Sequence, residues 1–200
     1  MAADRPRLPP GGASPRARLR WLLIVVAVMV LLTAGWPLLN AVVPDKQQLA
    51  AGTSLRVGPS GPNSASVRIG PGWTLRPAES DPRQGYLLRR GGVTVSIGYV
   101  SLAGVGHAAG IWSGLRRVLR VTNPGLRLGK PSAVTNGHGR LGLSATATGA
   151  HAAGNVTDFA GPSGTYAIQI VVLAPRDAKP LPAATSQLLI RSLRFPAASR

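Results

Sequence analysis

The side chains that could carry out chemistry are few in this sequence of 200 residues, and they are scattered along it. The three histidines, His107, His138 and His151, are too far apart in sequence for any two to form a helical pair of metal ligands. Cysteine is absent, which excludes disulfides, thiolate metal sites and thiol nucleophiles. We therefore expect neither a metal site nor a cofactor.

A serine hydrolase is the enzymatic alternative, because the members of a Ser–His–Asp triad need not be adjacent in sequence. It would require His107, His138 or Asp158 to meet a serine. Residues 110–114 (GIWSG) and 161–164 (GPSG) only approach the G-x-S-x-G nucleophile elbow. Carboxylates, on which most acid–base catalysis depends, number only six. We expect a protein that is not an enzyme and assign no catalytic residues.

Arginine clusters are the remaining chemical feature, in a chain with 23 Lys and Arg against 6 Asp and Glu and a net charge of +17. Arg89 and Arg90 precede a Gly-Gly turn, and three further arginines share one face of an expected helix. Guanidinium groups bind phosphate and carboxylate, so both clusters are candidate contacts for anionic lipid, wall polymer or an acidic envelope protein. The alternative is a solvated surface whose Arg stems cover apolar neighbours. The helical cluster consists of Arg116, Arg117 and Arg120.

Residues 21–43 form the strongest single signal, a run of 23 residues without a charge in which thirteen are Val, Leu or Ile. As a helix this run is about 34 Å long, enough to cross a hydrocarbon core of about 30 Å. A cleaved signal peptide is the alternative, but its apolar stretch is usually about 7–15 residues long. Here residues 36–43 continue the run beyond the small residues 33–35. The sequence predicts an uncleaved transmembrane helix.

Charges on either side of this helix determine its orientation. Five arginines precede it and few cations follow closely, so the positive-inside rule places residues 1–20 in the cytoplasm and the C-terminal domain outside the cell membrane. Nucleic acid is a poor partner for a basic domain outside the cell, and no nucleic-acid-binding motif accompanies it. The topology-determining residues are Arg5, Arg7, Arg16, Arg18 and Arg20.

Five segments are expected along the chain. The tail 1–20 is rich in proline with few large apolar residues, which predicts disorder. After the transmembrane helix 21–43, residues 44–52 form a linker and 53–196 an extracytoplasmic domain. Residues 197–200 are a C-terminal tail.

Alternation of apolar and polar residues predicts strands in most of the extracytoplasmic domain. We expect 53–57 to pair with 66–69, and 86–90 to pair with 93–99 through the tight Gly91-Gly92 turn. Residues 140–173 are expected to form an antiparallel meander. Its last strand, 165–173, is apolar on both faces, which is typical of a central strand.

Two helices are expected among these strands. In 108–121, five apolar residues share one helical face, and a weaker helix over 183–190 is followed by a short strand at 193–195. The fold class is therefore α+β, an antiparallel β-sheet with two packing helices, preceded by one N-terminal transmembrane helix. The five apolar residues are Ile111, Trp112, Leu115, Val118 and Leu119.

The order of these elements, with Gly72-Trp73 opening the hairpin region and residues 189–195 (LIRSLRF) closing the chain, resembles the PsbP-like superfamily over about residues 65–196. In particular it resembles the ectodomains of actinobacterial-type single-pass membrane proteins. The resemblance implies a non-enzymatic accessory or binding domain, with no catalytic residues to transfer. We expect a single-pass, membrane-anchored cell-envelope protein whose external domain is a non-catalytic binding or assembly module. The alternative is a carrier or sensor of lipid or a small apolar ligand, with Trp112 and Leu115 lining a pocket between helix and sheet.

Overall fold

The structure is a computed structural model that describes residues 45–102, 108–122, 124–176, 178 and 181–196. The predicted cytoplasmic tail with its five topology-determining arginines, the predicted transmembrane helix 21–43 and the tail 197–200 lie outside the described residues. Among the described residues, no helix is long and apolar enough to cross a membrane. The described residues belong to one compact unit, which begins at Asp45.

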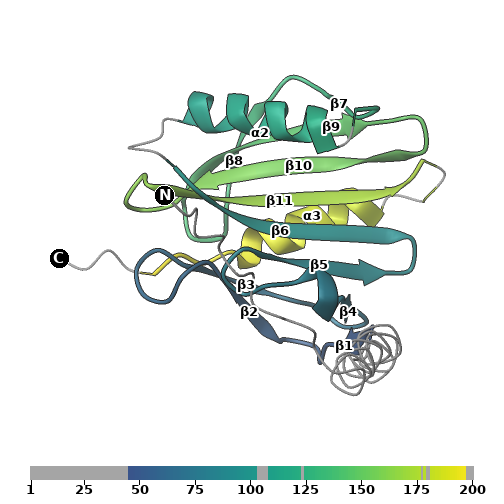
Figure 1. Ribbon diagram of the computed structural model, residues 1–200, viewed down its shortest axis with the longest axis horizontal. Coiled ribbons are helices and arrows are strands. Elements are labelled where there is room, and N and C mark those ends of the chain that lie inside the picture. Colours follow the sequence, from purple (N-terminus) through teal and green to yellow (C-terminus); the bar gives the residue numbers. More distant parts are fainter. Residues whose placement is uncertain (1–44, 103–107, 123, 177, 179–180, 197–200) are drawn as a thin grey trace, which may run out of the picture. The chain divides into compact units, whose positions relative to one another are not determined.

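An antiparallel sheet of nine strands dominates this unit (Figure 1). The strands are β1 (Gln47–Gln48), β4 (Thr74–Leu75), β5 (Gly85–Arg90), β6 (Val93–Ser101), β7 (Arg127–Leu128), β8 (Ser132–Thr135), β9 (Leu141–Thr148), β10 (Ala152–Ala160) and β11 (Tyr166–Pro175). Their order in the sheet is β1-β4-β5-β6-β11-β10-β9-β7, and β8 also pairs with β9. β2 (Ser54–Val57) and β3 (Ala65–Arg68) form a separate two-stranded sheet. The helices are η1 (Pro77–Glu79), a 3₁₀ turn, α2 (Ala108–Thr122) and α3 (Leu181–Ser192).

The predicted hairpin and meander are both confirmed, and β11 joins them into one sheet. β5 and β6 pair directly across the Gly91-Gly92 turn, and β9, β10 and β11 follow one another in the sheet. β11 pairs with β10 on one side and with β6 on the other, so it is a central strand as expected. Its residues Ile168, Ile170 and Val172 are fully buried.

The two faces of the sheet bury two separate hydrophobic clusters. Alternation along β11 sends Ile170 toward the larger cluster, which includes the β2–β3 hairpin and Leu189 of α3. Val171 points the other way, toward a smaller cluster built on Trp112 and Leu115 of α2. The α+β architecture with two packing helices on an antiparallel sheet is therefore confirmed for the described residues.

Several elements differ from the expectation. β1 lies inside the predicted linker 44–52, and β1, β4 and β7 have only two residues each, too few for alternation to show in sequence. The predicted strand 193–195 reduces to a single bridge between Arg194 and Ser66. Val118 is 56% exposed, because the buried face of α2 is narrower than the apolar stripe of its sequence.

Candidate functional site

The described residues do not assemble a catalytic constellation from the candidates of the enzymatic alternative. His138 is exposed and its Nε2 accepts a hydrogen bond from Arg194 Nε at 2.9 Å, while His151 is exposed in the turn before β10. His107 lies outside the described residues. Among the residues that the structure describes, no three His, Asp or Glu side chains come close enough together to hold a metal ion.

Asp158 on β10 is the chemically unusual carboxylate of the sheet. Its side chain is 3% exposed; Oδ1 accepts a hydrogen bond from the Leu143 N–H at 3.3 Å, and Oδ2 has no partner among the described residues. Burial raises the pKa of Asp158 to about 6, although the Leu143 N–H opposes this shift. Its neighbour Thr157 hydrogen-bonds Ser144 at 2.9 Å on the other face of the sheet, so Asp158 points away from that serine.

The outward face of α2 carries the predicted arginine cluster. Its inward face buries Ile111, Trp112, Leu115 and Leu119, so Trp112 and Leu115 fill a core instead of lining a pocket. Beside the arginines, Val121 is 78% exposed, which adds an apolar group to the same solvent-facing surface. The side chains of the cluster, Arg116, Arg117 and Arg120, are all exposed.

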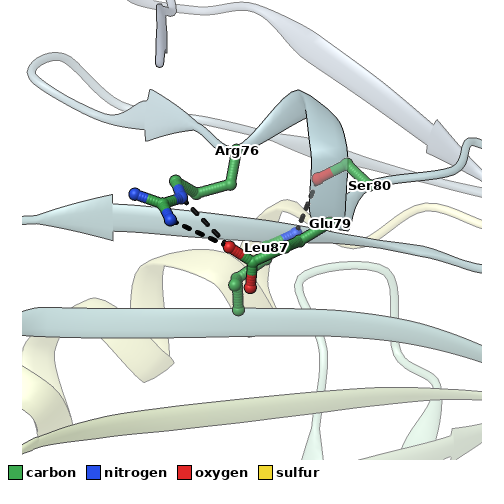
Figure 2. Close-up of polar contacts among 4 residues, drawn as sticks. All are labelled: Arg76, Glu79, Ser80 and Leu87. Carbon is green, nitrogen blue, oxygen red and sulfur yellow. Dashed lines mark hydrogen bonds and ion pairs between the residues drawn. The ribbon is translucent and has the colours of Figure 1, made fainter. Parts of the chain in front are cut away.

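These arginines have no acidic partner, because the ion pairs of the described residues reduce to one, between Arg76 and Glu79. Figure 2 shows this pair, with Nη2 of Arg76 3.0 Å from Oε1 of Glu79 on η1. The adjacent Ser80 Oγ accepts a hydrogen bond from the Leu87 N–H at 3.0 Å, which holds the end of η1 against β5. Glu79 therefore pairs with Arg76, and within the described residues neither predicted arginine cluster forms an ion pair.

The second predicted cluster, Arg89 and Arg90, lies at the end of β5 as expected, but its two side chains separate. Successive side chains of a strand point to opposite faces, so Arg89 and Arg90 do not form one patch. Arg90 shares the face of the buried Leu88, and its guanidinium lies 6.0 Å from the centroid of the Trp73 ring. Only Arg89 therefore remains on the opposite face of the hairpin.

Arg90 borders a groove between α3 and the ends of β3, β4 and β5, with a volume of about 300 Å³. Its floor is apolar, with Ile69, Trp73 and Leu189 almost fully buried. Arg68 is the second cation of its lining, and Leu188 of α3, 68% exposed, is an apolar residue open to solvent there. Sequence reasoning did not find this groove, because its residues come from four segments that are distant in sequence. Trp73, in Gly72-Trp73, is the part of the groove with a local sequence signal, and in the sequence it points only to the resemblance.

Comparison with known proteins supports the fold. No family model and no curated protein matches the chain. The solution structure of cyanobacterial PsbP (CyanoP) from Synechocystis sp. PCC 6803 matches with a TM-score of 0.53 at 9% identity, over 74% of this chain and 95% of that chain. A crystal structure from Bacteroides thetaiotaomicron matches with a TM-score of 0.34 at 14% identity, over 68% and 46% of the two chains. The fold of the domain is therefore PsbP-like.

Proposed function

We propose that this chain is a single-pass cell-envelope protein whose PsbP-like domain is a non-catalytic module that binds anionic lipid headgroups through α2. The observation that carries the proposal is the division of α2 into a buried apolar face and an outward face of Arg116, Arg117 and Arg120. A helix with a basic outer face beside an exposed apolar side chain suits the boundary between lipid headgroups and water.

The length of the chain between the predicted transmembrane helix and the domain supports lipid as the anionic partner. Residues 44–46 separate that helix from β1, which begins at Gln47, and three residues span at most about 11 Å. In the proposed topology the bilayer surface is therefore the anionic surface with the highest effective concentration at the domain. Wall polymers and acidic envelope proteins would have to compete with it.

The expected strength follows from the charge of the cluster. Each arginine near an anionic membrane surface contributes about 1 kcal/mol. Three arginines therefore favour the lipid-bound orientation of α2 by about 3 kcal/mol, which is roughly a hundredfold in the equilibrium constant. The attraction should weaken strongly at high salt, because exposed charges are screened.

A single fluorescent label on α2 can test the proposed lipid contact, because the chain has no cysteine of its own that would also be labelled. A Val121→Cys variant of the full chain carries one fluorescent label on α2, and the chain is reconstituted into vesicles with or without anionic lipid. We expect the label to be shielded from a water-soluble quencher only in anionic vesicles, and 0.5 M salt to restore quenching. A Gln187→Cys variant with the same label is the matched control, because Gln187 is exposed on α3. Its label should be quenched equally in vesicles with and without anionic lipid.

Charge removal tests the same contact. Replacing Arg116, Arg117 and Arg120 by Gln in the labelled protein should abolish the shielding while α2 remains folded. Equal quenching in neutral and anionic vesicles would exclude the lipid contact. Shielding that appears only when an acidic polymer is added to neutral vesicles would instead assign this face to the cell wall.

A further inference from the structure

We propose that the groove between α3 and the ends of β3, β4 and β5 binds a single-chain amphiphile with an anionic head group. This site is separate from the outward face of α2 and does not depend on the function proposed for that face. The ligand would place its acyl chain on the floor of the groove and its head group beside Arg68 and Arg90.

The floor of the groove is suited to an acyl chain. Ile69, Trp73 and Leu189 belong to the larger hydrophobic cluster and present apolar atoms to the groove. Leu188 on α3 extends this surface toward solvent and is 68% exposed. An acyl chain lying on these residues would be removed from water, and this becomes more favourable with each methylene that is buried.

The charges of the groove are all of one sign. Arg68 and Arg90 line it, and no Asp or Glu does. Within the described part of the chain neither arginine forms an ion pair, so both guanidinium groups can accept an anionic partner. Arg90 lies over the Trp73 ring, which restricts its guanidinium to the wall of the groove before any ligand binds.

Two polar side chains of α3, Ser192 and Thr185, also line the groove. Ser192 is used by the fold: its single O–H is shared between the carbonyls of Leu189 and Arg68, at 2.9 and 3.2 Å from Oγ, and its Oγ accepts the Arg68 N–H at 3.2 Å. Thr185 is 8% exposed, and its hydroxyl adds a polar group to the wall beside the apolar floor.

The size of the groove selects the class of ligand. A volume of about 300 Å³ lies at the lower end of the range for ligand sites. It accommodates one alkyl chain and not the two chains of a bilayer phospholipid. An uncharged alcohol would leave the two arginines unpaired, and a free anion would leave the apolar floor exposed, so both features are needed in one molecule.

Photo-crosslinking tests the proposal on the full chain in nanodiscs of zwitterionic lipid. The probe is decanoate with a diazirine near the end of its chain, and the labelled peptides are identified by mass spectrometry. We expect adducts in residues 68–73 and 185–192. Excess decanoate and decyl phosphate should each suppress them, and the better competitor identifies carboxylate or phosphate as the head group. Decanol should compete at least ten times more weakly, and acetate should not compete.

Variants link the labelling to the named residues. Arg68→Ala and Arg90→Ala should each lower probe affinity at least about tenfold, since each removes a charge-assisted contact to the head group. Arg89→Ala is the matched control, because Arg89 is the next residue on the same strand and points to the other face. It should leave the labelling unchanged, and thermal unfolding confirms that each variant is folded. Equal labelling in the Arg90→Ala and Arg89→Ala variants, or equal competition by decanol, would overturn the proposal.

Discussion

Arg90 lies over the indole ring of Trp73, with its guanidinium carbon 6.0 Å from the ring centroid. The contact ties the tip of the β5–β6 hairpin to the residue that precedes β4. Arg89, the adjacent residue on β5, points to the other face of the strand and has no such aromatic contact among the described residues. Arg90, one of the two arginines predicted at the hairpin tip, therefore forms part of the wall of the groove beside α3.

Replacing either residue of the Trp73–Arg90 contact by alanine should lower the stability of the domain, but by different amounts. Trp73 is 3% exposed, so Trp73→Ala should lower the free energy of unfolding by about 3–5 kcal/mol. Arg90→Ala should cost only about 0.5–1 kcal/mol, as expected for an exposed cation–π contact. Urea unfolding of residues 45–200, the unit that contains both hydrophobic clusters, measures both changes. A double-mutant cycle with zero coupling between these residues would contradict the contact.

Tyr166 should make the domain sensitive to alkaline pH. Its single O–H is shared between the carbonyls of Ser64 and Pro62, at 3.1 and 3.2 Å from the hydroxyl oxygen, and burial raises its pKa to about 12. Because the folded state favours the neutral phenol, the stabilisation is complete below about pH 10 and is lost as pH rises toward 12. Tyr166→Phe should cost about 1–2 kcal/mol at neutral pH.

The alkaline pH profile distinguishes this hydrogen bond from general packing. The difference in free energy of unfolding between wild type and Tyr166→Phe should shrink from pH 10 to 12, as measured by denaturant titrations at each pH. A difference that stays constant over this range would show that Tyr166 does not titrate with unfolding.

Asp158 should act in the same direction as Tyr166, but in the acid range of pH. Its pKa is raised from 3.8 to about 6 by burial, so the folded state favours the protonated acid. The contribution of this group is therefore most favourable below pH 4 and is lost as pH rises to about 6. Relative to Asp158→Asn, the wild-type domain should lose up to about 3 kcal/mol of stability between pH 3 and 7. An unchanged difference between the two proteins over this range would rule out a protonated Asp158.

Two glycines of the sheet should respond differently to alanine. A Cβ at Gly154 on β10 would collide with the Val172 carbonyl oxygen of β11, whereas a Cβ at Gly98 on β6 meets nothing within 4 Å. Gly154→Ala should therefore destabilise the domain by about 1–3 kcal/mol. Gly98→Ala should change stability by less than about 0.5 kcal/mol. Thermal unfolding of the two variants compares them, and equal melting temperatures would contradict the close approach of β10 and β11.

The proposed topology predicts the result of protease treatment of intact cells whose wall has been removed. External protease should digest the domain 53–196 and leave a protected fragment that contains residues 1–43. Replacing Arg5, Arg7, Arg16, Arg18 and Arg20 by Gln should reduce the fraction of correctly oriented chains, because these charges are expected to hold the N-terminus inside. A domain that resists protease until the membrane is lysed would reverse the orientation.

The elements that sequence predicted well are those whose signal is local. The Gly91-Gly92 turn fixes the pairing of β5 with β6, and the apolar run of β11 already required a central position in the sheet. β1 and β4 were missed because two residues cannot show alternation, and they exist only by pairing with each other and with β5. Val118 was assigned to the core because its helical position adjoins the apolar stripe, but the sheet beneath α2 leaves it exposed.

The sequence by itself determined the α+β class and the β5–β6 hairpin, and it predicts a membrane anchor and an arginine face on α2, because residue periodicity, turn chemistry and charge are properties of short segments. Only the tertiary structure decided that β11 lies beside β6, that Arg89 and Arg90 point to different faces, and that Arg68, Trp73, Arg90 and Leu188 border one groove. Contacts between distant segments depend on strand order and on how each helix packs on the sheet. Neither of these is encoded in the pattern of any one segment.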